Sequence, residues 1–365
     1  MGTMLQAHDL DLDQFEGHEG LNDILNLTRP DIVRDTHAAF FEVGSDCVET
    51  NTFSANYGGL YEYGIEDRTY EIAEAGARIA RETADAYATP DQPRYVLGSV
   101  GPGTRLPTLG HAPYTFLRDY YERTAHGLID GGSDAILIET CQDLLQVKAA
   151  VVGAKRARAA LGRDVPIIAQ VSIETNGTML MGSEIGAALT SLAPLGIDVI
   201  GLNCSTGPAE MSEHLRYLSH HSPIPISVMP NAGLPELGPP GAVYNLSPGE
   251  LADAHDTFTS EFGLSLVGGC CGTTPEHLRQ VVERVQGRGL KERRPLVEAA
   301  ASSLYQSVPF RQDASYLAVG ERTNANGSKK FREAMLAEDW DSCVEIARDQ
   351  IRDGAHVLDL NIDYV

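Results

Sequence analysis

The sequence lacks the features that mark membrane-spanning and secreted proteins. Its 365 residues contain no uninterrupted apolar run of about 18 residues, the length that a transmembrane helix needs. The opening segment, MGTMLQAHDLDLDQFEGHEG, has neither the basic start nor the apolar core of a signal peptide. We therefore expect a cytoplasmic protein without a membrane span.

Basic residues are scarce. The chain has 28 lysines and arginines against 51 aspartates and glutamates, which gives a net charge of −23. An acidic surface of this kind repels phosphate backbones, so we do not expect nucleic acid as a partner. The acidic residues are spread along the chain, which is typical of a solvated surface.

Several common site motifs are missing. The segment Gly101-Pro102-Gly103 lacks the spacing of a dinucleotide-binding fingerprint, and no GxxxxGK[ST] loop occurs. The eleven histidines form neither an HxH nor an HExxH motif. These absences argue against an NTPase and against a histidine-based metal site.

Short apolar runs alternate with amphipathic stretches through most of the chain. The runs are nearly continuous in hydrophobicity, which is typical of parallel strands covered on both faces. We predict strands at 46–51, 94–99, 134–139, 166–173, 198–203, 225–229 and 264–269. We predict helices at 31–43, 67–87, 113–131, 143–161, 183–194, 208–221, 247–262 and 275–285.

This pattern predicts an α/β fold of the (β/α)8 TIM-barrel type. An open doubly wound sheet would give a similar order of strands and helices. The strand–helix units here, however, follow one another without a break over the usual length of a barrel. One strand is unaccounted for, and it should be the first. Met1-Gly2-Thr3 resembles the loop that follows a strand.

The character of the sequence changes after the barrel. We assign residues 1–285 to the barrel, 286–312 to an interdomain linker and 313–365 to the start of a second α/β barrel. In the last segment we expect a strand at 316–320, a largely helical stretch at 329–353 and a strand at 356–361. The sequence is therefore expected to be truncated at both ends.

The unusual polar residues fall where the predicted strands end. In a parallel barrel these ends share one rim, and that rim carries the function. Strand-end residues that could contact a substrate are Glu49, Asn51, Ser99 and Glu139. A carboxylate at Glu139 could pair with the ammonium of an amino acid, although a structural ion pair or helix cap would explain its position equally well.

Three of the six cysteines also lie at strand ends. Cys204 ends one predicted strand, and Cys270 and Cys271 end another within the glycine-rich segment GGCCG. Three sulfur ligands suit zinc and leave its fourth tetrahedral position open, as in catalytic zinc sites. Cys204 alone could be a small buried apolar residue. The adjacent pair is harder to explain in that way, so we predict a zinc site.

Several motifs resemble one enzyme family. GLNCSTGP, MPNAGLP and GGCCGTTPEHLR, together with MGTMLQ, CVETNTFSAN, LGSVGPGT and LIETCQDLLQVKAA, resemble the homocysteine-binding domain of cobalamin-dependent methionine synthases over residues 1–285. VGERTNANGSKKF and HVLDLNID resemble the start of their folate-binding barrel. One departure is that the family carries Asp-Gly-Ala directly before MGTML, and this chain begins inside that motif.

The resemblance implies roles for individual residues. Cys204, Cys270 and Cys271 would bind zinc, homocysteine sulfur would take the fourth position, and Asn231 would be an oxygen ligand that the substrate displaces. Glu139 would bind the substrate ammonium, and backbone amides near Gly2 and Thr3 its carboxylate. Near the pterin, the resemblance places Asn324, Asp359 and Asn361.

The implied reaction is methyl transfer to a thiolate. A free thiol is mostly protonated at neutral pH, and coordination to zinc deprotonates it. By resemblance the donor is methylcobalamin, carried by a cobalamin domain that this chain lacks, and the methyl group comes ultimately from 5-methyltetrahydrofolate. The product would be methionine.

Three other interpretations remain open at this point. The chain could be a stand-alone homocysteine S-methyltransferase that uses another methyl donor, such as betaine or S-methylmethionine. It could be a zinc-binding or thiol-binding module without catalysis. It could also be a pterin-binding protein whose first barrel is a scaffold, which the strand-end cysteines argue against.

Overall fold

The computed structural model describes residues 1–238 and 241–363, which fall into two compact units. The first unit comprises Met1–Val297 with Leu304–Gln306, and the second comprises Glu298–Ser303 with Ser307–Val365 as far as residue 363. None of the described helices combines the length and hydrophobicity that crossing a membrane requires.

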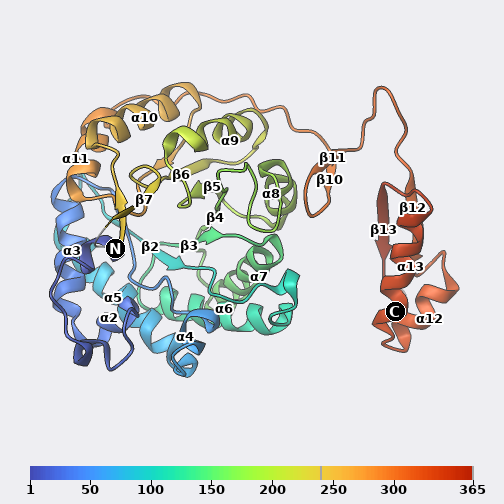
Figure 1. The fold of residues 1–365 in the computed structure, drawn as a ribbon, viewed down its shortest axis with the longest axis horizontal. Helices are drawn as coiled ribbons and strands as arrows, with labels where there is room; N and C mark the ends of the chain where they lie inside the picture. Colours follow the sequence, from blue (N-terminus) through green and yellow to red (C-terminus); the bar gives the residue numbers. More distant parts are fainter. Residues whose placement is uncertain (239–240, 364–365) are drawn as a thin grey trace. The chain divides into compact units, whose positions relative to one another are not determined.

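A curled, entirely parallel sheet of seven strands forms the centre of the first unit (Figure 1). Its order is β1-β2-β3-β4-β5-β6-β9, so consecutive strands of the sheet are neighbours in space. The strands are β1 (Cys47–Glu49), β2 (Tyr95–Val100), β3 (Ala135–Cys141), β4 (Ile167–Val171), β5 (Val199–Asn203), β6 (Ile226–Met229) and β9 (Leu266–Val267).

Amphipathic helices surround this sheet (Figure 1). The main helices are α3 (Pro30–Glu42), α5 (Thr69–Tyr87), α6 (Tyr114–Asp130), α7 (Leu144–Leu161), α8 (Ile185–Leu192), α9 (Pro208–His221), α10 (Pro248–Glu261) and α11 (Pro275–Val285). Several begin where the sequence offers a cap. At α10, Ser247 Oγ accepts from the Glu250 N–H, and Glu250 in return accepts from the Ser247 N–H.

The core lies between the sheet and its helices and inside the curl of the sheet. All five residues of β4 are buried, as expected for a strand covered on both faces. The predicted barrel is thus confirmed as a curled parallel sheet, and it is open between β1 and β9.

Two parts of the first unit differ from the prediction. Gly2–Leu5 forms a short helix, α1, where a loop was expected, because Leu5 is buried against Ile32 and Val33 of α3. Shorter helical segments then precede α3 and follow β1, namely η1 (Leu12–Phe15), η2 (Asn22–Ile24), α2 (Leu25–Thr28), α4 (Tyr57–Tyr61) and η3 (Glu66–Arg68).

A hairpin inserted after β6 is the second difference. It consists of antiparallel β7 (Pro235–Gly238) and β8 (Gly241–Tyr244). It carries Tyr244 toward the strand ends, because Leu246 N–H donates to Ala232 O just beyond it. Two further 3₁₀ segments, η4 (Pro107–Leu109) and η5 (Ala193–Leu195), lie in loops.

The second unit contains two small sheets. Antiparallel β10 (Ala300–Ser302) and β11 (Ser307–Pro309) form one of them inside the predicted linker. Parallel β12 (Val319–Asn324) and β13 (Val357–Asn361) form the other, connected through α12 (Lys329–Leu336) and α13 (Trp340–Arg352). The expected single helical stretch breaks at Glu338, whose φ of 56° is left-handed, and Asp339 then caps α13.

Candidate metal centre

Three cysteine side chains converge at the C-terminal rim of the curled sheet. The Sγ atoms of Cys204, Cys270 and Cys271 all lie within 4.8 Å of one another, and those of Cys204 and Cys271 are 3.9 Å apart. Cys204 directly follows β5, whereas Cys270 and Cys271 follow β9. The sequence-predicted trio is therefore brought to one point from two strands that β6 separates.

The loop after β6 ties the two cysteine segments together. Cys204 N–H donates to Met229 O at 3.1 Å, and Cys270 N–H donates to Pro230 O at 2.8 Å. Asn231 Oδ1 accepts from Cys271 N–H at 3.1 Å. The MPNAG segment thus sets the spacing of the cluster, and Asn231, predicted as a displaceable ligand, lies beside it with one oxygen lone pair already engaged.

Backbone strain helps to aim Cys204. Both Cys204 and Ser205 have left-handed backbones, with φ of 56° and 59°. Residues other than glycine rarely adopt this backbone conformation, and each one that does destabilises the fold by about 1–3 kcal/mol. Two of them in succession turn the chain sharply at the end of β5, which brings the Cys204 sulfur to the rim.

The three thiols share hydrogen bonds. Those from Cys204 and Cys270 hold the pKa of Cys271 well below its ordinary value. The hydrogen bonds of Cys270 with Cys204 and with Cys271 raise the pKa of Cys270, and burial adds to that rise. The cluster therefore already favours a thiolate at Cys271.

Tyr244 is a neighbour of the cluster that sequence reasoning missed. Its side chain is hydrogen-bonded to Cys271. It reaches that position by packing over Gly272, where an added Cβ would lie 2.5 Å from Tyr244 ring and Cβ atoms. The available signal was the glycine after the cysteine pair, but nothing in the sequence pointed to Tyr244 as its partner.

Buried carboxyl groups lie on the same rim. Both oxygens of Glu139 are engaged, with Ser99 Oγ donating to Oε1 at 2.5 Å and Asn203 Nδ2 donating to Oε2 at 3.1 Å. Burial raises the pKa of Glu139. Asn203 also accepts from Thr140 N–H at 2.6 Å, so it fixes the end of β3 to the end of β5.

Glu49 lies close to this carboxyl group. Burial, and next the charge of Glu139, raise the pKa of Glu49 to about 8. The ammonium of Met1 acts in the opposite direction on both groups. A positive charge at this point of the rim lowers the pKa of both carboxyl groups and so favours their ionised form.

The other residues predicted to contact the substrate lie in two separate places. Thr3 Oγ1 accepts from Gly272 N–H at 3.1 Å, which places the start of the chain beside the cysteine pair, with Gly2 adjacent in sequence. Asn51 instead uses its amide nitrogen for Asn22 O at 2.8 Å and Asn26 Oδ1 at 3.2 Å. It therefore joins a hydrogen-bonded group with η2 and α2, the two short helical segments directly before α3.

The predicted pterin-contact residues are gathered in the second unit. Asn324 and Asn361 are paired in register at the ends of β12 and β13. Asn324 Nδ2 donates to Asp359 Oδ2 at 2.7 Å. The three polar side chains thus share the C-terminal end of one strand pair.

Comparison with known proteins gives two family matches. Residues 1–285 match the family described as Homocysteine S-methyltransferase, and residues 320–365 match the family described as Pterin binding enzyme.

Two curated relatives are similar over the whole chain. Methionine synthase from Mycobacterium tuberculosis is 61% identical over 365 residues, and methionine synthase from Mycobacterium leprae is 59% identical over 372 residues. Each comparison covers 100% of this chain, and the chain spans 31% of the length of either relative.

The fold is similar to that of solved homocysteine methyltransferase structures. The metallated form of MmuM from Escherichia coli has a TM-score of 0.63 and 21% sequence identity, covering 78% of this chain and 93% of that chain. The oxidized form has a TM-score of 0.61 at 22% identity, with the same coverage. At this level of identity the likeness shows the shared fold.

Proposed function

Because the chain belongs to the homocysteine S-methyltransferase family across residues 1–285, we propose that it binds homocysteine at the cysteine cluster and methylates its sulfur. The observation that carries the proposal is the meeting of Cys204, Cys270 and Cys271 within 4.8 Å at the rim where a parallel sheet carries its function.

The cluster has the donor set and the spacing that zinc requires. Zinc–sulfur bonds of about 2.3 Å in a tetrahedron place two sulfurs about 3.8 Å apart. The Cys204 and Cys271 sulfurs are 3.9 Å apart, so little rearrangement would be needed. A bound zinc would supply an open fourth position and hold the homocysteine sulfur as a thiolate. Three cysteinates leave the site with a net charge of −1, which preserves electron density on that sulfur.

The carboxyl pair is proposed to orient the substrate. Glu139 and Glu49 favour a cation at the rim, and an amino acid brings one in its ammonium group. Ser99 and Asn203 hold Glu139 in place, so the ammonium would meet a fixed acceptor. Backbone N–H groups near Gly2 and Thr3 are proposed to bind the substrate carboxylate, which the contact of Thr3 with Gly272 supports.

Two further residues are proposed to act on the cluster. Asn231 would occupy the fourth position through its oxygen and leave when homocysteine binds, supported by its contact with Cys271. Tyr244 would donate to the Cys271 sulfur and draw negative charge from it, which tunes the electron density on the cluster.

The proposed methyl donor is methylcobalamin, carried by a domain outside this chain. The support is the similarity to methionine synthases over the full chain and the pterin-binding match at residues 320–365. Asn324, Asp359 and Asn361 are proposed to contact 5-methyltetrahydrofolate. We place the reaction in the cytoplasm, where thiols stay reduced.

Metal analysis of matched cysteine variants tests the proposal. We expect about one zinc per chain in the wild type, and its loss in Cys270→Ser, because the variant keeps only two of the three thiolates that would bind the metal. Cys343→Ser is the control, since Cys343 lies on α13 in the second unit and outside the cluster. Turnover of homocysteine with free methylcobalamin should follow the zinc content in all three proteins.

Three outcomes are informative. Zinc retained by Cys270→Ser would disprove the metal site. Zinc bound with full occupancy but no turnover with any methyl donor would favour a binding module without catalysis. Turnover with S-methylmethionine or betaine, and none with methylcobalamin, would favour a stand-alone enzyme with another donor.

A further inference from the structure

The chain turns sharply at the end of β5, over residues Asn203–Thr206, which we call the elbow. Cys204 and Ser205 at its centre both have left-handed backbones, with φ of 56° and 59°. Neither cysteine nor serine favours this conformation, because the Cβ atom crowds the backbone there. A return to an ordinary conformation at either residue would move the Cys204 sulfur away from the cluster. The elbow therefore depends on contacts that hold it in place.

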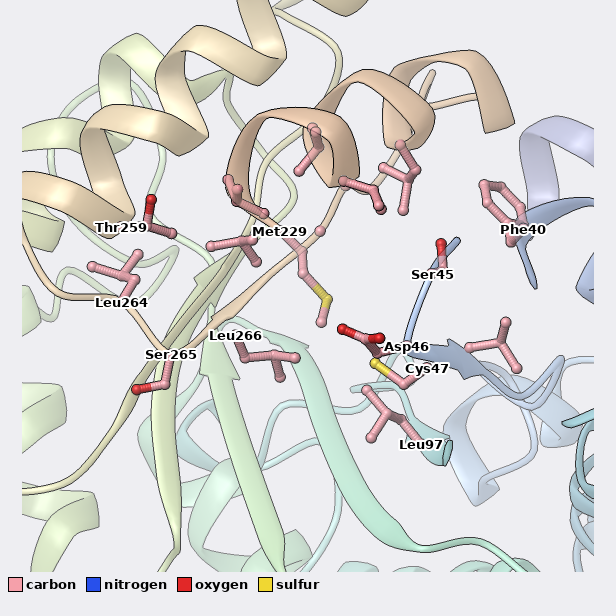
Figure 2. Close-up of a pocket in the computed structure, with 18 of the residues that line it drawn as sticks. Phe40, Ser45, Asp46, Cys47, Leu97, Met229, Thr259, Leu264, Ser265 and Leu266 are labelled. Atoms are coloured by element: carbon pink, nitrogen blue, oxygen red, sulfur yellow. The ribbon is translucent and has the colours of Figure 1, made fainter. Parts of the chain in front are cut away.

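The end of β6 holds one side of the elbow. Met229 O accepts from Cys204 N–H at 3.1 Å. Met229 is itself kept in place by burial within an apolar cluster. Figure 2 shows its side chain between Leu266 and Cys47, which pack against the same cluster. This contact fixes the backbone of Cys204 but does not reach the next residue of the elbow.

The end of β4 holds the other side of the elbow, through the residues before and after Cys204. Ser172, directly after β4, donates from its Oγ to Asn203 O at 2.8 Å. Glu174, two residues further on, accepts from Ser205 Oγ at 3.0 Å through its Oε1. Both neighbours of Cys204 are thus bonded to one short segment, and the bond to Glu174 engages the side chain of a left-handed residue.

The loop after β4 sets the direction of the Glu174 side chain. Glu174 N–H donates to Thr178 O at 2.9 Å, and Gly177 N–H donates to Glu174 O at 2.9 Å, which closes a tight turn. Met179, directly after this turn, is fully buried in the main core of the first unit. A half-buried carboxylate that starts from a closed and anchored turn loses little conformational freedom when it binds Ser205.

We propose that Glu174 is a positioning residue for the metal and homocysteine site, which holds Ser205 in its left-handed conformation and thereby keeps the Cys204 sulfur in the cluster. The inference rests on the proposed function, because it takes the cluster as the place where zinc and homocysteine bind. The metal-ligating group consists of the three cysteine sulfurs, so Glu174 acts on it through Ser205 and not as a ligand.

Two substitutions separate the acceptor of Glu174 from its charge. Glu174→Ala removes the acceptor, whereas Glu174→Gln keeps an oxygen that accepts from Ser205 Oγ and removes the charge. Zinc affinity is measured by competition with a chelating dye. We expect Glu174→Ala to weaken zinc binding about tenfold to a hundredfold, the range seen when a residue that orients a ligand is lost, and Glu174→Gln to stay within about threefold of the wild type. Glu82→Ala, at an exposed position on α5, is the control and should match the wild type.

Substitutions of Ser205 test the way in which Glu174 acts. Glycine adopts a left-handed backbone without a steric penalty, so Ser205→Gly keeps the conformation without an outside contact. We expect Ser205→Gly, combined with Glu174→Ala, to restore most of the lost zinc affinity. Ser205→Ala keeps the strain and removes the bond, so it should weaken zinc binding as much as Glu174→Ala does, and the two losses should not add.

Two further measurements do not depend on turnover. Cobalt(II) takes the place of zinc in tetrahedral thiolate sites, and its visible absorption depends on the coordination geometry. We expect the cobalt spectrum of Glu174→Ala to differ from that of the wild type, and the spectrum of the combination with Ser205→Gly to match it. In the metal-free proteins, hydrogen exchange in peptides that contain the elbow should be about tenfold faster in Glu174→Ala, with peptides from α5 unchanged.

Three results would overturn the inference. Zinc affinity in Glu174→Ala equal to that of the wild type would mean that the elbow keeps its shape without this bond. Equal losses in Glu174→Ala and Glu174→Gln would mean that the charge acts and not the acceptor. No recovery on adding Ser205→Gly would mean that Glu174 acts by a route other than Ser205. Should Glu174→Ala fail to fold, Ser205→Ala and Ser205→Gly compared with each other decide the same question.

The proposed function fails in a different way. A wild-type protein that binds no zinc would contradict the metal site, whatever the variants do. Hydrogen exchange in the metal-free proteins would still show whether Glu174 holds the elbow. Zinc bound by the wild type and equally well by Glu174→Ala would leave the metal site standing and remove only the role of Glu174.

Discussion

Buried acids are the residues whose state the protein controls most tightly. In a chain of net charge −23, Glu139 and Asp23 are buried and Glu49 is half-buried, and burial raises the pKa of each. Glu139 and Glu49 face the proposed substrate site. Asp23 faces a loop instead, where its Oδ1 accepts from Ser54 N–H at 2.7 Å. Its protonation therefore affects the stability of the packing between η2 and the segment after β1.

Asp23 should make the protein less stable as the pH rises. Burial raises its pKa from 3.8 to about 7, so the folded chain holds a proton that the unfolded chain releases between those values. Stability from this group is complete below pH 4 and is lost by about pH 7. We expect Asp23→Asn, which keeps the oxygen acceptor without the charge, to be more stable than the wild type at pH 8 by at most about 4 kcal/mol.

Urea unfolding at pH 5 and pH 8 measures this effect. The advantage of Asp23→Asn should shrink toward pH 5, and Asp91→Asn, at an exposed position, should show none. A constant difference between the variant and the wild type at both pH values would contradict the assignment.

Some contacts of single residues at the site could be predicted from the sequence, and others could not. The meeting of Cys204, Cys270 and Cys271 could be predicted, because strand ends of a parallel sheet share one rim. The contact of Tyr244 with Cys271 could not be predicted, since it depends on a hairpin with no counterpart in the repeating pattern. The role of Asn203 in joining β3 to β5 was missed because it depends on the orientation of an amide group.

Secondary-structure elements were predicted well where burial on both faces imposes a continuous apolar run. The expected strand at 166–173 contains β4, and the helix expected at 208–221 coincides with α9. The β7–β8 hairpin was missed because PELGPPGAVY reads as a turn, with proline and glycine where a strand pattern is expected. Helix α1 was missed because a four-residue helix has no periodicity to detect, and burial of Leu5 holds it in place.

The packing of the β7–β8 hairpin on the cysteine segment leads to a prediction at the level of elements. A methyl group at Gly272 would lie 2.5 Å from Tyr244, and the φ of 77° at this position is one that alanine rarely adopts. We expect Gly272→Ala to displace β8 from the cysteine pair and to lower zinc affinity about tenfold or more, in the range seen when support around a metal site is lost.

Competition with a chelating dye measures this affinity. Gly289→Ala is the matched control, because an added Cβ there has no neighbour within 4 Å and the backbone needs no left-handed φ. Zinc affinity in Gly272→Ala equal to that of the control would mean that the hairpin does not support the site.

At the scale of the whole molecule, the two units differ strongly in their apolar cores. The first unit has a continuous core between sheet and helices, whereas the core of the second rests on Ala325, Phe331 and Ile346 with the half-buried Met335 and Cys343. Apolar side chains that stay largely exposed in the second unit are Phe310, Val319, Leu336, Trp340, Val344, Ile351, Leu360 and Ile362. A small core offsets little of the conformational entropy that folding costs, so the second unit should be the less stable one.

The sole tryptophan of the chain makes this difference measurable. Trp340 lies at the start of α13, so its fluorescence reports on the second unit, while far-ultraviolet circular dichroism is dominated by the first. We expect the fluorescence midpoint to lie about 10 °C or more below that of the dichroism signal, as a difference of a few kcal/mol would produce. Removing zinc with a chelator should then lower the dichroism midpoint and leave the Trp340 midpoint in place, because all three cysteine ligands belong to the first unit. A single coincident transition, shifted as one by the chelator, would mean that the two units unfold cooperatively despite the difference between their cores.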